Sequence, residues 1–286
     1  MRPSPVACCS IPSGPDLRFL GALAFLLFLS LPAQAQNFEY FMLEMGWLPG
    51  QCLVDPKMPI CADLSLQNEQ ARNLTLIGLK PEPRPGAMAL RDCDPISKAF
   101  TTPAISPQDK VTSCSLPALK LDKVMQAELA DLMPDIAACP ERAYWAKYGS
   151  CAMLSPARYF ERAVARARDI QNSLLNVAIA GAMGKRITRE TLAEAFEMQF
   201  GPETARSLQL ICTRSKEHRQ QVLTGVRIAI NQIGSMRNLT GDGLWHAPGV
   251  AFSARCPDEF LVAEPGAEEP PLPEKPLFED PFATPE

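Results

Sequence analysis

The chain has 286 residues and a formal net charge of −4, and this charge is unevenly spread. Residues 264–286 hold seven acidic residues and one lysine, which leaves residues 36–263 close to neutral. A near-neutral domain lacks the strong basic footprint of a tight nucleic-acid binder. Composition therefore argues against general RNA binding, although it leaves room for a local basic groove.

Residues 1–35 have the pattern of an export signal. Arg2 and Arg18 precede an apolar run at 19–31, and Ala33-Gln34-Ala35 supplies a small-x-small cleavage pattern. The apolar run is short for a membrane span, with an uncleaved anchor as the alternative. We expect a mature chain that begins at Gln36, is periplasmic or secreted, and has no membrane association after cleavage.

The first half of the mature chain predicts strands at 39–47 and 74–79, followed by a helix at about 118–132 that ends before Pro134. The short apolar run at 74–79 is typical of a buried strand. A helix then begins at Ser155-Pro156, an N-cap followed by proline at the first helical position, and is expected to reach about Leu175.

Thr188 caps the next predicted helix, and Gly201 ends it. Strands are expected at 207–212 and 226–231, the second with alternating apolar and polar residues. Mixed helices and strands indicate one α+β domain over 36–263. The Pro- and Glu-rich segment 264–286 predicts a disordered acidic tail. The positions expected to face inward on the capped helix are Leu192, Ala195, Phe196 and, less regularly, Met198.

The mature chain keeps eight cysteines. An even number in an exported chain predicts four disulfides formed in an oxidising compartment. Zinc binding is the alternative, but no Cys-x-x-Cys spacing occurs and both histidines lie elsewhere, so we expect no metal and no cofactor. The cysteine count leaves the pairing open. The eight residues are Cys52, Cys61, Cys93, Cys114, Cys139, Cys151, Cys212 and Cys256.

Two short stretches carry a resemblance. Residues 74–81 read Leu-Thr-Leu-Ile-Gly-Leu-Lys-Pro, and residues 144–151 read Tyr-Trp-Ala-Lys-Tyr-Gly-Ser-Cys. They resemble the two active-site segments of the ribonuclease T2 family. The stretch from Tyr40 to Cys52 is similar to the family's opening strand. The order and approximate spacing of the cysteines resemble the bacterial periplasmic ribonuclease I branch. The resemblance covers about residues 38–262.

This resemblance implies a central antiparallel sheet flanked by helices. It also suggests how the cysteines pair, although the middle two pairs could equally be crossed. The suggested disulfides are Cys52–Cys61, Cys114–Cys151, Cys212–Cys256 and, from the two that remain, Cys93–Cys139.

The family cleaves RNA without a metal. One histidine takes the proton of the ribose 2′-hydroxyl and another protonates the leaving 5′-oxygen, while a glutamate and a lysine stabilise charge on the phosphate. Histidine suits both transfers because its pKa lies near the working pH. The resemblance places Ile77 at the first histidine, Tyr144 at the glutamate and Tyr148 at the second histidine, and retains Lys147. An aliphatic side chain cannot exchange a proton, and a phenol is a poor base at neutral pH.

Candidate substrate contacts come from the same stretches. They are Lys80, which stands at a family tryptophan, together with Tyr148 and Trp145. Lys80 and Lys147 could hold an anion between them, or each could be an ordinary solvated lysine. The chain's two histidines, His218 and His246, lie in polar or loop-like stretches with no motif partner, and we expect both on the surface.

Three functions follow from these observations. The leading hypothesis is an exported ribonuclease T2-fold protein that is catalytically inactive, a pseudoenzyme whose cleft retains binding of RNA or nucleotides. The first alternative is an active endoribonuclease that cleaves RNA through a 2′,3′-cyclic phosphate with rearranged groups: Tyr148, Lys147 and His246. The second alternative is a secreted protein-interaction module whose partner the sequence does not identify.

Overall fold

The computed structural model describes residues 38–93, 113–216, 219–232, 238–246 and 256–266. These belong to one compact unit that begins at Asn37. The predicted signal, most of the predicted tail and His218 lie outside the described residues. Within them, none of the helices combines the length and apolar character needed to span a bilayer.

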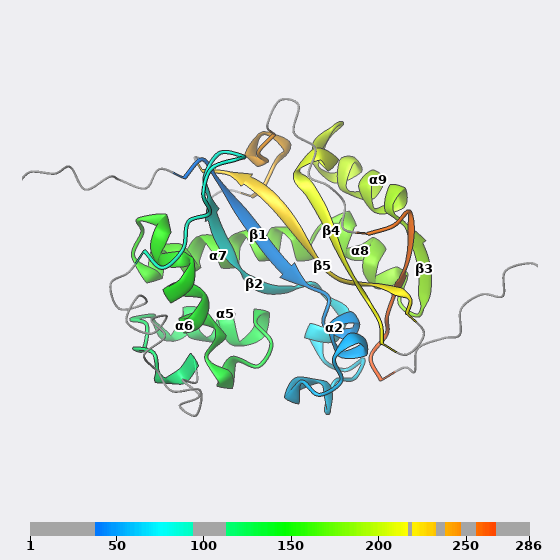
Figure 1. The fold of residues 1–286 in the computed structure, drawn as a ribbon, viewed down its shortest axis with the longest axis horizontal. Helices are drawn as coiled ribbons and strands as arrows, with labels where there is room; N and C mark the ends of the chain where they lie inside the picture. Colours follow the sequence, from blue (N-terminus) through cyan, green and yellow to red (C-terminus); the bar gives the residue numbers. More distant parts are fainter. Residues whose placement is uncertain (1–37, 94–112, 217–218, 233–237, 247–255, 267–286) are drawn as a thin grey trace, which may run out of the picture. The chain divides into compact units, whose positions relative to one another are not determined.

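The described residues form a six-stranded sheet in the order β2-β1-β5-β6-β3, with β4 pairing along the free edge of β5 (Figure 1). The pairs are antiparallel, except that β5 meets β6 in parallel through Val222 and Leu261. The α+β class is confirmed, and the sheet is mixed rather than purely antiparallel. The strands are β1 (Tyr40–Gly46), β2 (Thr75–Glu82), β3 (Lys185–Thr188), β4 (Leu208–Arg214), β5 (Gln221–Asn231) and β6 (Glu259–Val262).

Helices flank this sheet. The long helix α7 packs against β1 and β2, while α2 contacts β5 (Figure 1). Short 3-10 turns occur between several elements, among them Pro59–Cys61, Ser113–Ser115, Ile136–Ala138 and Thr204–Ser207. The α-helices are α2 (Leu48–Val54), α3 (Glu69–Arg72), α5 (Lys123–Leu132), α6 (Pro140–Lys147), α7 (Pro156–Gln171), α8 (Leu174–Gly181) and α9 (Arg189–Phe200).

Two helix boundaries differ from the prediction. Helix α7 ends at Gln171 rather than near Leu175, because the buried Ser173 hydroxyl bonds back to the Ile170 carbonyl at 2.7 Å and a separate helix follows. Helix α5 begins at Lys123 instead of Ala118. Asp122 caps it by accepting a hydrogen bond from the Met125 amide at 2.7 Å. Local side-chain bonds to the backbone therefore set both boundaries.

Helix α9 follows the prediction at both ends. The Thr188 hydroxyl accepts a bond from the Thr191 amide at 3.1 Å, and the helix ends before Gly201. Leu192 and Phe196 are fully buried, but Met198 is 77% exposed, so its inward placement was wrong. Two residues along a helix correspond to about 200° of rotation, which puts Met198 on the side opposite Phe196.

The core lies between the sheet and α7. Residues that alternate along β1 and β5, such as Leu43 and Ile228, are fully buried on the face that meets α7. Tyr159 of α7 is also fully buried, and its hydroxyl accepts a hydrogen bond from the Leu79 amide of β2 at 3.0 Å. This bond joins the helix to the strand inside the core and fixes how β2 sits over α7.

Four disulfides join all eight cysteines of the predicted mature chain. The pairs Cys52–Cys61 and Cys212–Cys256 are confirmed. The suggested middle pairs, Cys114–Cys151 and Cys93–Cys139, were wrong. The observed bonds are Cys93–Cys151 and Cys114–Cys139, a crossed arrangement of the kind that the prediction left open. Helix α6 separates Cys139 from Cys151, and each cysteine bonds the segment at its own end. The Asp92 amide, for example, donates to the Lys147 carbonyl at 2.8 Å and so brings Cys93 to Cys151.

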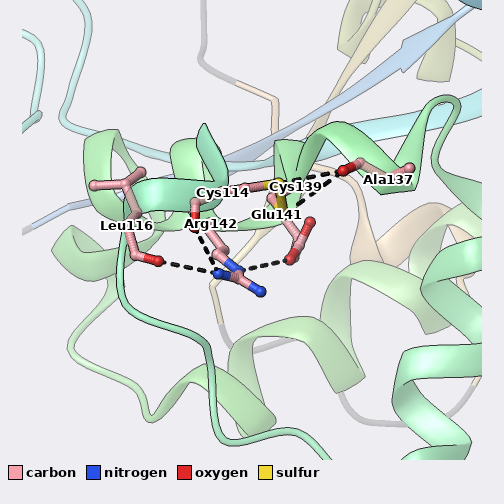
Figure 2. Close-up of a disulfide and its surroundings, with 6 residues drawn as sticks. All are labelled: Cys114, Leu116, Ala137, Cys139, Glu141 and Arg142. Carbon is pink, nitrogen blue, oxygen red and sulfur yellow. Dashed lines mark hydrogen bonds and ion pairs between the residues drawn. A yellow bond between two sulfur atoms is a disulfide. The ribbon is translucent and has the colours of Figure 1, made fainter. Parts of the chain in front are cut away.

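Figure 2 shows the disulfide at the start of α6. Arg142 donates from Nη1 to the carbonyls of Cys114 and Leu116, both at 3.1 Å, and forms an ion pair with Glu141 at 3.4 Å. The Ala137 carbonyl oxygen lies 3.2 Å from the Cys114 sulfur. The disulfide and the guanidinium together hold the 113–116 segment against the first turn of α6.

Candidate functional site

A groove of about 500 Å³ lies between α6 and β2. Its volume falls within the usual range of small-molecule sites. Helix α6 contributes positions spaced by three and four residues, which place their side chains on one face of the helix. These residues are Pro140, Ala143, Tyr144 and Lys147. The opposite walls come from α2, the turn at 58–60, β2 and the 133–135 segment.

A β-bulge turns Ile77 toward this groove. In the β1–β2 ladder Glu44 faces Gly78 and Met45 faces Leu76, so Ile77 has no partner on β1. An extra residue of this kind bends the strand and redirects its side chain. Leu76 and Leu79 on either side are buried in the core, whereas Ile77 is 39% exposed and lines the groove.

Tyr144 closes the sheet side of the site. Its ring lies against Gly78 so tightly that a Cβ added there would be 2.2 Å from a ring carbon. The Tyr144 hydroxyl donates to Glu44 of β1 at 2.9 Å, and the other Glu44 oxygen pairs with Arg227 of β5 at 2.8 Å. Burial, and then the negative charge of Glu44, raise the Tyr144 pKa well above its ordinary value. Tyr144 is therefore a fixed hydrogen-bond donor.

Two lysine side chains lie near the Tyr148 ring. The Lys80 ammonium is 5.1 Å from the centre of its ring and the Lys147 ammonium is 5.2 Å away, both within cation–π range. Lys80 is ion-paired with Glu82 at 2.6 Å. Lys147 is exposed and has no ion pair within the described part of the chain. The structure thus brings Ile77, Tyr144, Lys147 and Tyr148 into one groove. Lys80 lies near the Tyr148 ring but is not among the residues that line the groove.

Trp145 occupies a different environment. Its ring packs edge-on against Tyr159 at 5.3 Å, and a Cβ added to Gly149 would be 2.8 Å from the indole. Trp145 is not among the residues that line the groove. In this position it supports the turn after α6.

His246 also lies away from the groove. Its Nδ1 is 2.7 Å from the Ser207 hydroxyl oxygen, next to the start of β4. The neighbouring Leu244 bridges to Ile230 of β5, and the Trp245 amide donates to the Ala229 carbonyl at 3.0 Å. Since β1 occupies the other edge of β5 and β2 lies beyond it, this segment is about 14 Å, three strand spacings, from β2. The structure does not bring His246 to the groove lining.

Sequence reasoning missed Glu44 and Arg227. They belong to strands far apart in the chain, so no local motif links them. One signal was present: Glu44 interrupts an otherwise uncharged strand, Tyr-Phe-Met-Leu-Glu-Met-Gly. A carboxylate there must face away from the apolar core or be paired.

The chemistry available in the groove is narrow. Its described lining contains no histidine, and its charged side chains are Lys147 and Asp135. The described residues contain no group of three or more His, Cys, Asp or Glu side chains that could hold a metal ion. Among its described lining residues the site therefore offers an exposed ammonium, one carboxylate, two phenols and a largely apolar surface.

Comparison with known proteins agrees with this fold. The sequence model of the ribonuclease T2 family matches residues 38–239, more than half of the chain. No sequence among the curated proteins matches this chain. Several solved structures do.

Three of these structures illustrate the likeness. Ribonuclease MC1 from bitter gourd seeds is 20% identical, with a TM-score of 0.53 over 78% of this chain and 100% of that one. The Nicotiana alata self-incompatibility SF11-RNase is 16% identical, with a TM-score of 0.55 over 80% and 100%. RNase NT in complex with 5′-AMP is 13% identical, with a TM-score of 0.55 over the same shares. At these identities the likeness concerns the fold, and together with the family match it leads to one conclusion. The chain belongs to the ribonuclease T2 family.

Proposed function

We propose that this chain is an exported, non-hydrolytic ribonuclease T2-fold protein that uses its groove to bind RNA fragments or nucleotides. One observation carries the proposal. The three side chains assigned by resemblance to the family's proton-transfer and glutamate positions, Ile77, Tyr144 and Tyr148, gather at one groove that holds no histidine among its described lining residues. Binding in a related fold is illustrated by RNase NT, which holds 5′-AMP.

The lost groups account for a large rate effect. Each positioned general acid or base is worth on the order of 10²- to 10⁴-fold. The rate contributions of two catalytic groups that act as a unit do not multiply in full. A phenol and an aliphatic side chain nevertheless replace neither of the two histidines. Tyr144 is already occupied as a donor to Glu44 at 2.9 Å. Rearranged catalysis through His246 loses support, because that ring lies beside Ser207 and outside the groove lining.

Export and the family branch are part of the proposal. All eight cysteines of the predicted mature chain are disulfide-bonded, which suits the periplasm or the extracellular space rather than a reducing cytosol. The order and spacing of these cysteines support placement in the bacterial periplasmic ribonuclease I branch.

The test is to restore the chemistry. We compare the mature protein with an Ile77→His/Tyr148→His double variant and an Ile77→Leu/Tyr148→Phe control that changes the same positions without adding histidine. We expect no RNA cleavage by wild type or control, measurable cleavage by the histidine variant, and a rise in Tm of the wild type with 5′-AMP. Cleavage by wild type that survives removal of contaminating nucleases and is lost in the control would overturn the proposal.

A further inference from the structure

Four polar side chains of the groove lining are available to a ligand. Lys147 and Asp135 are the charged members of the described lining, and neither side chain forms an ion pair or a hydrogen bond within the described part of the chain. The hydroxyls of Tyr148 and Ser113 have no hydrogen-bond partner there either. A bound molecule can therefore meet a cation, a carboxylate and two hydroxyls without displacing contacts within the protein.

The cation and the carboxylate lie toward opposite ends of the groove. Lys147 is seven residues beyond Pro140 on α6, which corresponds to about 10 Å along the helix axis. Asp135 precedes Pro140 by the single 3-10 turn Ile136–Ala138. An extended 5′-nucleotide spans a similar length from its phosphate to the Watson–Crick edge of its base. The largely apolar lining between the two ends suits the faces of that base.

The Asp135 carboxylate stands on a rigid turn that does not itself require an acid. Its backbone is in the left-handed region, at φ 54° and ψ 43°, and its carbonyl accepts a bond from the Ala138 amide at 2.8 Å. Pro134 precedes the turn, and the disulfide between Cys139 and Cys114 follows it. Asparagine and glycine adopt this conformation as readily. Uncommon backbone conformations gather at ligand sites, and this one presents a carboxylate to the groove.

A carboxylate without a partner distinguishes between the four bases. It only accepts hydrogen bonds, and its two oxygens can accept two parallel bonds. Guanine offers two donors side by side, N1–H and the 2-amino group. Adenine and cytosine place an acceptor beside their donor, and uracil places its N–H between two carbonyl oxygens, so an acceptor of each would face a carboxylate oxygen. A bidentate pair of this kind gives roughly ten-fold discrimination or more.

We propose that the groove is selective for guanine nucleotides, with the phosphate at Lys147 and the guanine N1–H and 2-amino groups at Asp135. The inference rests on the proposed function, since it names the base that the same groove takes. Lys147 binds the phosphate through a charge-assisted hydrogen bond, and the Tyr148 hydroxyl is a second donor in the groove lining. Asp135 is the residue that determines specificity.

Isothermal titration calorimetry on the mature protein tests the base preference with 5′-GMP, 5′-IMP, 5′-AMP and 5′-UMP. We expect 5′-GMP to bind roughly ten-fold more tightly than 5′-AMP and 5′-UMP, and more tightly than 5′-IMP, which lacks the 2-amino group. Asp135→Asn keeps the size of the side chain and its tolerance of the left-handed backbone, but replaces one acceptor with a donor. It should weaken 5′-GMP binding roughly ten-fold, abolish the difference between 5′-GMP and 5′-IMP, and leave 5′-AMP binding no weaker.

Two further variants separate base recognition from charge. Glu194→Gln removes the same charge from an exposed position of α9, which contributes nothing to the described groove lining, and should change no affinity. Lys147→Met should weaken 5′-GMP binding, leave guanosine binding unchanged and keep the preference for 5′-GMP over 5′-IMP. Titration of the dinucleotide pGpU identifies the source of the base. Tighter binding than 5′-GMP indicates an RNA fragment and weaker binding a free nucleotide, and both support the inference.

The opposing outcomes separate this inference from the proposed function. Equal affinities for 5′-GMP and 5′-AMP, or a preference for 5′-GMP that survives Asp135→Asn, overturn the guanine selectivity and leave nucleotide binding intact. A loss of 5′-GMP and 5′-AMP binding alike in Asp135→Asn also overturns it, because it assigns Asp135 a structural role. No binding of any nucleotide by wild type overturns both, and RNA cleavage by wild type overturns the non-hydrolytic function alone.

Discussion

The two faces of the β1–β2 pair differ sharply although they share the same strands. On the inner face, Leu43 and Leu79 face each other across the ladder and pack against α7, fully or almost fully buried. On the outer face, Glu44 and Lys80 are charged, and each is paired with an opposite charge. Alternate residues of one strand therefore belong to two separate environments.

The difference shows how this family member can keep its fold while side chains on the outer face of the β1–β2 pair change. Burial against α7 restricts the inner positions to apolar residues of the right volume, since cores are close-packed. The outer positions are restricted instead by their ion pairs with one another and by contacts with a ligand in the groove. Substitution at Glu44 or Lys80 changes the charge there, whereas Tyr40 and Met42 on the same face are buried in a second apolar cluster with Trp245.

The largest contrast is expected between adjacent residues of β1. Leu43→Ala should reduce the free energy of unfolding by about 2–5 kcal/mol, because it leaves a cavity in the core. Glu44→Gln keeps the side chain's shape and an acceptor for Tyr144, and loses a partly exposed ion pair worth about 1 kcal/mol or less. Urea denaturation of both variants measures the difference. Equal losses would remove the distinction between the faces.

Alkaline pH probes the outer face next. Burial, and then Glu82 and Glu39, raise the Tyr40 pKa from 10.0 to about 12. Stability should be level below pH 10 and fall between pH 10 and 12, because the unfolded chain loses the phenolic proton first. Burial also raises the pKa values of Tyr144 and Tyr159, which extend the loss to higher pH.

Tyr40→Phe isolates that contribution. The variant keeps a ring to stack on Trp245, whose centroid lies 4.0 Å away, and removes the titrating hydroxyl. The free energy of unfolding is obtained from urea denaturation at half-unit steps from pH 9 to 12. Its decrease with pH should be less steep for the variant than for wild type, by the equivalent of about one proton. Identical slopes would show that Tyr40 does not contribute to the alkaline loss.

The smallest of these contrasts concerns Gly78, which faces Glu44 on the outer face. Gly78→Ala would place a Cβ 2.2 Å from the Tyr144 ring, and displacement of that ring should cost about 1–3 kcal/mol and shift Tyr144 off Glu44. Gly181→Ala, at the end of α8 with nothing within 4 Å of the new Cβ, is the control and should be neutral or slightly stabilising. Thermal unfolding of both variants measures the difference in stability. Equal Tm values would show that the Tyr144 ring can move aside at no cost in stability.

The predictable part of the fold follows from local periodicity and capping. Alternation along Val226–Asn231 identified β5, and Thr188 and Gly201 marked the ends of α9 because caps act within one helical turn. Local patterns did not reveal that Ser173 separates α7 from α8. The apolar pattern continues across this position and predicts one helix, but the hydrogen bond from Ser173 to the Ile170 carbonyl ends the helix there.

The parts of the candidate site that lie in short sequence motifs could be predicted. The contacts between segments that are far apart in the sequence could not. Residues 74–81 and 144–151 located both sides of the groove. The pairing of Cys93 with Cys151 and the bond between Glu44 and Tyr144 depend on which segments meet at each end of α6 and across the sheet. Sequence spacing does not contain that information, because widely separated segments become neighbours only on folding.

The bulge at Ile77 has a consequence for how this protein can change. The ladder skips this residue, and its side chain leaves the core whatever its chemistry, since the skip belongs to the main chain. We therefore expect position 77 to accept aliphatic, polar and imidazole side chains at a smaller cost in stability than the buried positions of β2. A lineage could lose a reactive group here and regain it by one substitution, while selection on the neighbouring core residues continued undisturbed.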